Sequence, residues 1–211
     1  MRELLIATKN PGKYLEIVEV FEGANFRTVF LADLNLEDGN FVEDGETLRE
    51  NALKKASYYA KRAGMLTLAE DSGILVEALK GELGVKTRRW GAGEKASDQE
   101  WIDFFMKKME EVPEEKRGAS FVCAACVTDG NDTQIFMGET AGKITKKLES
   151  PILKGLPLSS CFMPDGMNKV YAALSAEEKN RVSHRGKAIT KAREFLVANN
   201  FSGGDNREER H

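Results

Sequence analysis

The segment that most constrains this chain is Leu66-Thr-Leu-Ala-Glu-Asp-Ser-Gly73, which alternates apolar and polar residues before it reaches two adjacent carboxylates. The alternation predicts a half-buried strand that stops at Glu70 and Asp71, after which Gly73 lets the chain turn or a ligand approach. Neighbouring strand residues point to opposite faces, so we expect one carboxylate in an open cleft and the other against neighbouring backbone. Carboxylates at the end of a strand commonly hold hard cations such as Mg²⁺ together with substrate phosphates. The alternative is an acidic corner between a strand and a loop, exposed to water.

Length and charge limit the classes of protein to which the chain can belong. Its 211 residues favour one α/β domain with a subsidiary lobe. The 31 Lys and Arg residues against 34 Asp and Glu residues give a net charge of −3, so the basic surface needed for duplex nucleic acid is absent. No apolar run approaches the ~20 residues of a membrane span, and the first residues lack a secretory signal. We therefore expect a soluble cytosolic protein that does not bind membranes.

The N-terminal segment predicts a strand, a basic turn and a helix. Arg2 to Thr8 has the composition of a buried strand, and Lys9-Asn-Pro-Gly-Lys13 is a turn cluster. A basic, amide-bearing turn at a helix N-terminus is a natural site for an anion, although the spacing of a Walker loop is absent. The helix is expected to run from Lys13 to Phe21. Its buried stripe is expected to consist of Leu15, Val18 and Phe21.

The other elements follow from capping signals, glycines and alternating apolar runs. Thr47-Leu-Arg-Glu50 has the sequence of a capping box and begins a helix that Gly64 ends. Ser97 and Ser175 begin two further helices in the same way. We expect strands at 26–31, 119–128, 133–138 and 140–147, a loop over 150–168, and a last helix over 187–198.

The three cysteines, Cys123, Cys126 and Cys161, are assigned no chemistry. Cys123-Ala-Ala-Cys126 has the spacing of a redox or zinc half-site, but no second pair of cysteine or histidine residues completes four ligands. The apolar residues around them favour cysteines buried in a strand.

Four segments occur in an order and at distances that indicate a family. They are Thr8-Lys-Asn-Pro-Gly-Lys13, Glu43-Asp-Gly-Glu-Thr-Leu-Arg-Glu-Asn-Ala52, Ala69-Glu-Asp-Ser-Gly73 and Ser183-His-Arg-Gly-Lys-Ala188. Together they resemble the inosine triphosphate pyrophosphatase family, and the likeness covers nearly the whole chain. That family hydrolyses non-standard purine nucleoside triphosphates to a monophosphate and pyrophosphate. The resemblance implies an α/β fold with an elongated mixed sheet, flanking helices and two lobes around a central cleft, usually in a homodimer.

The resemblance also implies roles for individual residues of the cleft. Glu43 and Asp71 would bind Mg²⁺, and Asp71 would be the catalytic base that activates the attacking water. A triphosphate carries about four negative charges, and water attacks its α-phosphorus only where that charge is neutralised and the water is held in line. Arg89 is a secondary candidate for a substrate contact. The residues expected to bind the substrate are Thr8, Asn10, Lys13, Lys55, Ser72, Lys179, His184 and Arg185.

Two segments depart from the family pattern. The first carboxylate of the usual Asp-Asp-Ser-Gly is Glu70 here, one methylene longer with the same charge, and we expect it to be tolerated. Where the family has Gly-Phe-Gly-Tyr/Trp-Asp-Pro, this chain has Gly155-Leu-Pro-Leu-Ser-Ser160. The two aromatics become Leu156 and Leu158, and the aspartate becomes Ser159. Purine specificity therefore does not carry over, and we expect recognition of the base to be weak and mostly apolar.

Three functions fit these residues. A Mg²⁺-dependent nucleoside triphosphate pyrophosphatase, acting on nucleotides such as ITP, dITP or XTP with its base specificity open, fits the retained carboxylates and lysines. A hydrolase of another phosphorylated substrate fits the altered base end, as does a non-catalytic nucleotide-binding protein on the same scaffold. In each case we expect residues 1–201 to form one two-lobed domain and 202–211 a disordered tail.

Overall fold

A computed structural model describes residues 1–37, 41–93 and 95–199, and the predicted tail at 202–211 lies outside these ranges. The strands are β1 (Arg2–Ile6), β2 (Phe26–Phe30), β3 (Thr67–Val76), β4 (Gly118–Thr128), β5 (Thr133–Ile144) and β6 (Phe162–Pro164). They form one sheet in the order β2-β1-β3-β4-β5-β6. β1 is parallel to β2 and β3, whereas β3, β4, β5 and β6 pair antiparallel. The predicted mixed sheet is confirmed.

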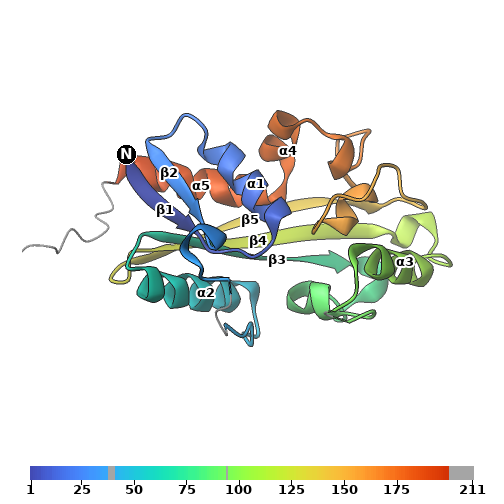
Figure 1. The fold of residues 1–211 in the computed structure, drawn as a ribbon. Coiled ribbons are helices and arrows are strands. Elements are labelled where there is room, and N and C mark those ends of the chain that lie inside the picture. The colour runs from blue at the N-terminus through green and yellow to red at the C-terminus, as the bar shows by residue number, and fades with distance from the viewer. Residues whose placement is uncertain (38–40, 94, 200–211) are drawn as a thin grey trace, which may run out of the picture.

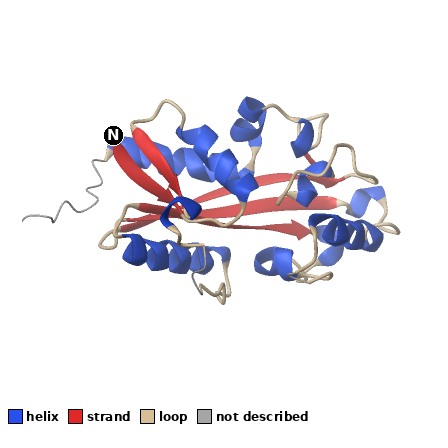
Figure 2. Cartoon of the chain, in the orientation of Figure 1, coloured by secondary structure: helices blue, strands red, loops and turns tan. Residues whose placement is uncertain are grey.

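Helices cover both faces of the sheet (Figures 1 and 2). The α-helices are α1 (Pro11–Phe21), α2 (Leu48–Ala63), α3 (Asp98–Lys108), α4 (Ala176–Val182) and α5 (His184–Ala198). Figure 1 shows α1 and α5 on one face of the long strands and α2 on the opposite face. Short 3₁₀ helices are η1 (Ala32–Leu34), η2 (Glu77–Leu79), η3 (Gly84–Arg89), η4 (Glu114–Lys116), η5 (Pro157–Ser160) and η6 (Tyr171–Ala173). No helix within the described ranges is long and apolar enough to cross a membrane.

The capping signals place the helix ends correctly. Thr47 caps α2 by accepting a hydrogen bond from the backbone N–H of Glu50, and Gly64 ends that helix with a left-handed φ of 62°. Ser97 and Ser175 each complete a reciprocal capping box at the start of α3 and α4. These local signals work because each satisfies backbone groups that the helix itself leaves unpaired.

The apolar core divides into two halves along the sheet, which gives the molecule its two lobes. One half holds two clusters on opposite sheet faces, with Ile189 of α5 in the first and Tyr59 of α2 in the second. The other half is built around Trp101 and Phe105 of α3, which pack with Phe162 of β6. The long strands β3, β4 and β5 run through both halves, so the predicted two-lobed α/β architecture is confirmed.

The prediction that the β3 strand stops at its carboxylates is wrong. β3 continues through Glu70 and Asp71 to Val76, because β4 pairs with it along its whole length. Gly73 does not turn the chain either. A Cβ atom at Gly73 would lie 2.1 Å from the carbonyl oxygen of Gly84, so this glycine allows η3 to approach the strand closely. The two carboxylates therefore project from the rigid middle of a strand.

A single strand replaces the two predicted at 133–138 and 140–147. β5 pairs with β4 without a break from Thr133 to Lys143. Gly138, interpreted from the sequence as a strand end, instead admits α5, because a Cβ atom there would lie 2.0 Å from the carbonyl oxygen of His184. The predicted loop over 150–168 likewise contains η5 and β6, and β6 pairs with the end of β5.

The predicted buried stripe of α1 is partly wrong. Leu15 is 59% exposed, whereas Ile17, Val20 and Phe21 are buried together with the carboxylate-bearing Glu16. The register moves because Asn10 caps the helix and Glu16 has buried cationic partners. The expectation for the cysteines is confirmed: all three are free and buried. Burial raises the pKa of two of them, Cys126 and Cys161, to about 12.

Candidate active site

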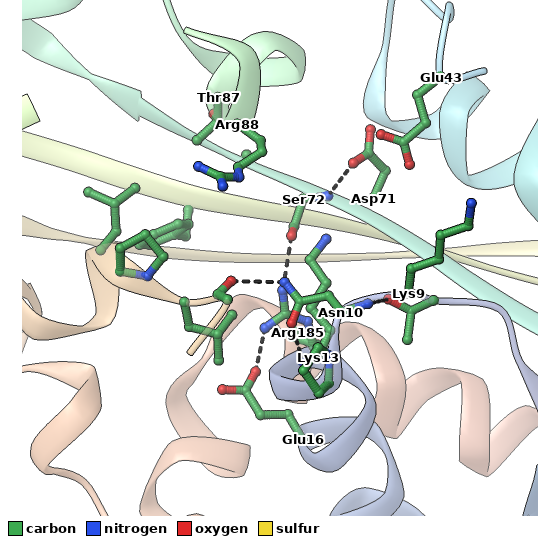
Figure 3. Close-up of a pocket in the computed structure, with 18 of the residues that line it drawn as sticks. Lys9, Asn10, Lys13, Glu16, Glu43, Asp71, Ser72, Thr87, Arg88 and Arg185 are labelled. Carbon is green, nitrogen blue, oxygen red and sulfur yellow. Dashed lines mark hydrogen bonds and ion pairs between the residues drawn. The ribbon is translucent and has the colours of Figure 1, made fainter. Parts of the chain in front are cut away.

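A cavity of about 770 Å³ lies at the junction of the two lobes (Figure 3). Its walls come from the loop between β1 and α1, the segment before α2, the middle of β3, η3, the segment 154–159 and the start of α5. All ten residues predicted for the site line this cavity: Thr8, Asn10, Lys13, Glu43, Lys55, Asp71, Ser72, Lys179, His184 and Arg185. The structure thus brings the predicted side chains together, and their roles stay predictions.

The two adjacent carboxylates of β3 have opposite surroundings. Asp71 lines the cavity, as Figure 3 shows, whereas the side chain of Glu70 is fully buried. Glu70 braces charged side chains rather than the backbone that was expected: its Oε1 lies 2.6 Å from Nζ of Lys13, and its Oε2 lies 3.5 Å from Nε of Arg185.

These surroundings move the two pKa values apart. Burial raises the pKa of Glu70, but the charges of Lys13 and Arg185 outweigh it and hold that pKa well below its ordinary value. Burial also raises the pKa of Asp71, and there Lys13 and Lys55 offset only part of the effect. A neighbouring pair split in this way suits a permanently charged anchor and a proton acceptor. Of the two, Asp71 has the raised pKa that a proton acceptor needs.

Asn51, whose role was not predicted from the sequence, fixes Asp71 in place. Its side-chain amide donates to Oδ2 of Asp71 at 2.9 Å, and its Oδ1 accepts from the backbone N–H of Gly45 at 2.7 Å. Asn51 is fully buried, so both bonds are shielded from water. They hold Asp71 against the segment that carries Glu43. The sequence feature that could have indicated this role is a polar residue, Asn51, on the inner face of α2. It lies in the motif 43–52, in which only Glu43 was given a role.

Lys55 and Arg89 hold Glu43 from two sides. Lys55 forms an ion pair with the Glu43 carboxylate and also donates to the backbone oxygen of Glu70 at 3.1 Å. Burial raises the pKa of Glu43, but the charge of Lys55 outweighs it, so that pKa lies below its ordinary value. Arg89, the secondary candidate for a substrate contact, donates to the backbone oxygen of Glu43 at 2.6 Å.

Asn10 already occupies the predicted anion site at the start of α1. Its Oδ1 accepts hydrogen bonds from the backbone N–H groups of Gly12 and Lys13, at 2.9 and 3.1 Å. The N–H of Tyr14 donates to the Asn10 carbonyl, and Pro11 has no N–H to offer. The amides of this first turn are therefore satisfied within the protein, and an anion here would meet side chains rather than a free helix end.

Glu16 is a second buried carboxylate that the sequence analysis missed. It forms ion pairs with both Lys179 and Arg185, and Arg185 in turn donates from Nη2 to Oγ of Ser72 at 3.0 Å. Burial raises the pKa of Glu16, yet the two cations outweigh it and keep its pKa below the ordinary value. Nothing in the local pattern revealed Glu16, because its partners lie at the far end of the chain. Lys179 and Arg185 therefore line the cavity while each forms an ion pair with Glu16.

Aromatic rings lie against His184, which also lines the cavity. Its ring stacks on Phe121 at a centroid distance of 4.6 Å and lies 6.0 Å from the ring of Tyr171. Burial, and then the charge of Arg185, lowers the pKa of His184 well below its ordinary value, so the imidazole is neutral. Leu156 and Leu158 line the same cavity. The altered loop therefore supplies leucines, while β4 and η6 still supply aromatic rings.

Comparison with known proteins identifies the family. The family model described as "Ham1 family" matches residues 4–195. The chain belongs to the Ham1 family. A protein of Caldanaerobacter subterraneus subsp. tengcongensis named dITP/XTP pyrophosphatase is 36% identical over 198 residues, 93% of this chain and 97% of that relative. One from Geobacter sulfurreducens with the same name is 38% identical over the same shares.

Two solved structures of Ham1 proteins share the fold. That of Coxiella burnetii aligns with a TM-score of 0.77 at 28% identity, covering 94% of this chain and all of the other. That of Staphylococcus aureus aligns with a TM-score of 0.76 at 31% identity, covering 93% and 99%. The resemblance to the inosine triphosphate pyrophosphatase family is confirmed by these names and by the fold.

The donors of this Ham1-family chain suit a cation that the substrate helps to bind. Within the described residues no group of three or more His, Cys, Asp or Glu side chains could hold a metal ion. Glu43 and Asp71 line the same cavity and are close enough for the charge of Glu43 to raise the pKa of Asp71. Mg²⁺ is commonly bound by one or two carboxylates that act together with substrate phosphates and water. Two carboxylate donors fit that mode. Zinc prefers sets of thiolate and imidazole ligands, and the described residues bring together no such set here.

Proposed function

We propose that this chain is a nucleoside triphosphate pyrophosphatase that converts non-standard purine nucleotides, such as dITP and XTP, to the monophosphate and pyrophosphate. The observation that carries the proposal is that Glu43, Asp71, Lys13 and Lys55 line the same cavity as His184. The first four residues, here called the phosphate end, suit a polyphosphate with a cation, and the ring of His184, here called the base end, suits a flat base. The names of the Ham1 relatives support the same activity.

Different residues of the cavity would have different roles in the reaction. Lys13 and Lys55 would contact the polyphosphate and stabilise the negative charge that builds up on the departing pyrophosphate. Asp71, whose pKa is raised by burial, would accept the proton of the water that attacks the α-phosphorus. Its hydrogen bond from Asn51 fixes the carboxylate before the substrate arrives. Glu43 and Asp71 would hold a divalent cation, which when bound neutralises phosphate charge.

The base end would bind by stacking and by contacts from the start of α5. The neutral ring of His184 stacks on Phe121 and offers a flat surface beside Lys179 and Arg185. Because Glu16 pairs with both cations, they are held in fixed positions rather than left to follow the substrate.

A panel of nucleoside triphosphates tests the proposed function. We expect the chain, supplied with Mg²⁺, to release pyrophosphate from ITP, dITP and XTP. Binding of these nucleotides without turnover would indicate the non-catalytic alternative. Turnover of other phosphorylated compounds alone would indicate a different hydrolase, and either result would contradict the proposal.

Discrimination between purines is expected to be modest, because Leu156 and Leu158 are apolar and line the altered side of the base end. An apolar slot discriminates between similar ligands by only ~10–200-fold. We therefore expect kcat/KM for ITP to exceed that for GTP by no more than this factor. A ratio above about a thousand would show that hydrogen bonds from another segment read the base.

Activity is expected to require a divalent cation, because Glu43 and Asp71 line the cavity and add negative charge to that of a triphosphate, which a bound cation would offset. Excess EDTA should abolish pyrophosphate release, and Mg²⁺ added beyond the chelator should restore it. Full activity in EDTA would show that the reaction needs no divalent cation. Thermal unfolding in EDTA serves as the control, since a site completed by the substrate should leave the protein alone equally stable with and without the ion.

The finer expectations from the sequence belong to the same proposal. They are Mg²⁺ as the cation, a homodimer as the assembly, the cytosol as the location, and a single two-lobed domain over residues 1–201. The first is supported by the oxygen donors of the cavity, and the others by the resemblance to the family.

A further inference from the structure

Both backbone groups of Gly155 are bound by side chains from two other segments that line the cavity. The N–H of Gly155 donates to Oδ2 of Asp98 at 2.6 Å, and its carbonyl oxygen accepts from Nδ2 of Asn10 at 2.9 Å. Asp98 lies 57 residues before Gly155 and Asn10 lies 145 residues before it. Two distant segments thus clamp one residue at the start of the altered base loop.

Glycines make this close approach possible. Gly155 has a φ of 76°, and a Cβ atom there would lie 2.5 Å from Oδ1 of Asn10. A Cβ atom at Gly12 would lie 2.7 Å from the carbonyl oxygen of Lys154 and 3.1 Å from the side chain of Leu156. The segment from Lys154 to Leu156 therefore lies directly on the first turn of α1.

The carboxylate of Asp98 is not needed to cap α3. Ser97 accepts the hydrogen bond from the backbone N–H of Glu100, and the Glu100 side chain accepts from the backbone N–H of Ser97, so the capping box is complete without Asp98. Asp98 lines the cavity, and its bond to Gly155 has a charged acceptor, which strengthens it.

The clamp joins the two ends of the cavity. Asn10, one arm of the clamp, also caps α1, and that helix carries Lys13 of the phosphate end. Gly155, held between the two arms, directly precedes Leu156, and Leu158 of the base end follows two residues later. Asp98 is the one arm that does not touch α1, so changing it should disturb the base wall and spare the phosphate end.

We propose that Asp98 is a positioning residue that fixes the base-end wall, and so sets how tightly the base is held, through its bond to Gly155. The role in catalysis rests on the proposed pyrophosphatase function. The bond itself does not, so it can be tested on the protein without substrate.

The test compares Asp98→Ala with Asp98→Asn, which keeps an acceptor oxygen, and with Asp103→Ala as a matched control. Asp103 lies on the exposed side of the same helix, and its carboxylate accepts from Gln99. Amide hydrogen exchange at Gly155 is measured in each, together with KM and kcat for ITP and the inhibition constant of inorganic triphosphate. Inorganic triphosphate probes the phosphate end alone, because it has no base.

In Asp98→Ala we expect exchange at Gly155 to rise about tenfold or more, and KM for ITP to rise by a similar factor, as for loss of a hydrogen bond with a charged partner. Inhibition by inorganic triphosphate should stay within about twofold of the parent protein. Asp98→Asn should give intermediate values for exchange and KM, and Asp103→Ala parental ones. If Asp98→Ala does not fold, Asp98→Ser, whose hydroxyl is too short to reach Gly155, is measured instead and the same changes are expected.

Unchanged exchange at Gly155 would overturn the proposal, and so would inhibition by inorganic triphosphate that weakens as much as KM rises. If the parent protein turns over no nucleotide, the pyrophosphatase proposal fails by itself. The positioning role of Asp98 is then tested by the exchange at Gly155 and by direct binding of ITP and inorganic triphosphate. Binding of ITP should still weaken more than binding of inorganic triphosphate.

Discussion

Replacement of Asp71 by asparagine is expected to lower kcat by about 10²–10⁴-fold, the range for loss of a general base. The substitution keeps the volume of the side chain, but one of the two oxygens that accept from Nδ2 of Asn51 and from the N–H of Ser72 becomes an amide group, so we expect the fold to persist with slightly lower stability. It removes a negative charge from the proposed cation site and the carboxylate whose raised pKa suits it to accept a proton. Both effects act on the chemical step more than on the binding of the nucleotide.

The measurement is steady-state kinetics with the best nucleotide of the panel, together with thermal unfolding. Asp165→Asn is a matched control, because Asp165 is an exposed aspartate on a turn outside the cavity. It should retain parental kinetics. Turnover by Asp71→Asn within threefold of the parent would show that another residue activates the water.

Replacement of Glu70 by glutamine is expected to lower the free energy of unfolding at neutral pH by about 3–5 kcal/mol, the usual effect of breaking a buried ion pair. Glu70 is fully buried against Lys13 and Arg185, and glutamine keeps its shape but leaves both cations without this partner. Urea unfolding measures the change. Glu70→Asp keeps the charge and should lose less, and Glu114→Gln, which breaks an exposed pair with Lys143, should change stability little.

The same variant should change the response to acid. Since the pKa of Glu70 is held well below its ordinary value, its carboxylate stabilises the fold above about pH 4.3, and this contribution is lost as the pH falls toward the folded-state pKa. The pKa of His184 is also lowered, so below about pH 6.5 the unfolded chain takes up a proton that the folded chain does not. Both groups therefore make the protein less stable in acid. Glu70→Gln should make the curve less steep below about pH 4.3, and parallel curves for variant and parent in that range would contradict the Glu70 ion pair.

The sequence predicted those parts of the fold that local chemistry decides. Thr47, Ser97 and Ser175 satisfy the N–H groups of the turns that follow them, so each helix start could be placed from four residues. Glycines were harder to interpret, because the same residue can end an element or admit a neighbour. Gly73 was expected to let the chain turn or a ligand approach, and Gly138 to end a strand. Both instead admit a neighbouring element, which only the positions of η3 and α5 show.

The candidate site was predicted where a motif holds its residues close together in sequence, and missed where partners meet across the fold. Asp71 and Glu43 reach the cavity, as the resemblance implied. The role of Glu16 could not be predicted, because it depends on an ion pair with Arg185, 169 residues away. An isolated glutamate in a helix predicts a solvent-facing residue. The bond between Asp98 and Gly155 is of the same kind. Long-range pairs of this sort depend on the packing of α1 against α5 and of the loop against α3, which no local pattern specifies.

Hydrolysis of ITP in water labelled with heavy oxygen tests the central proposal most directly, because the position of the label shows which phosphorus is attacked. Attack on the α-phosphorus with Asp71 as the base predicts one labelled oxygen in inosine monophosphate and none in the pyrophosphate released. Label in inorganic phosphate, with inosine diphosphate as the other product, would show attack on the γ-phosphorus and would contradict the assignment of this cavity to a pyrophosphatase.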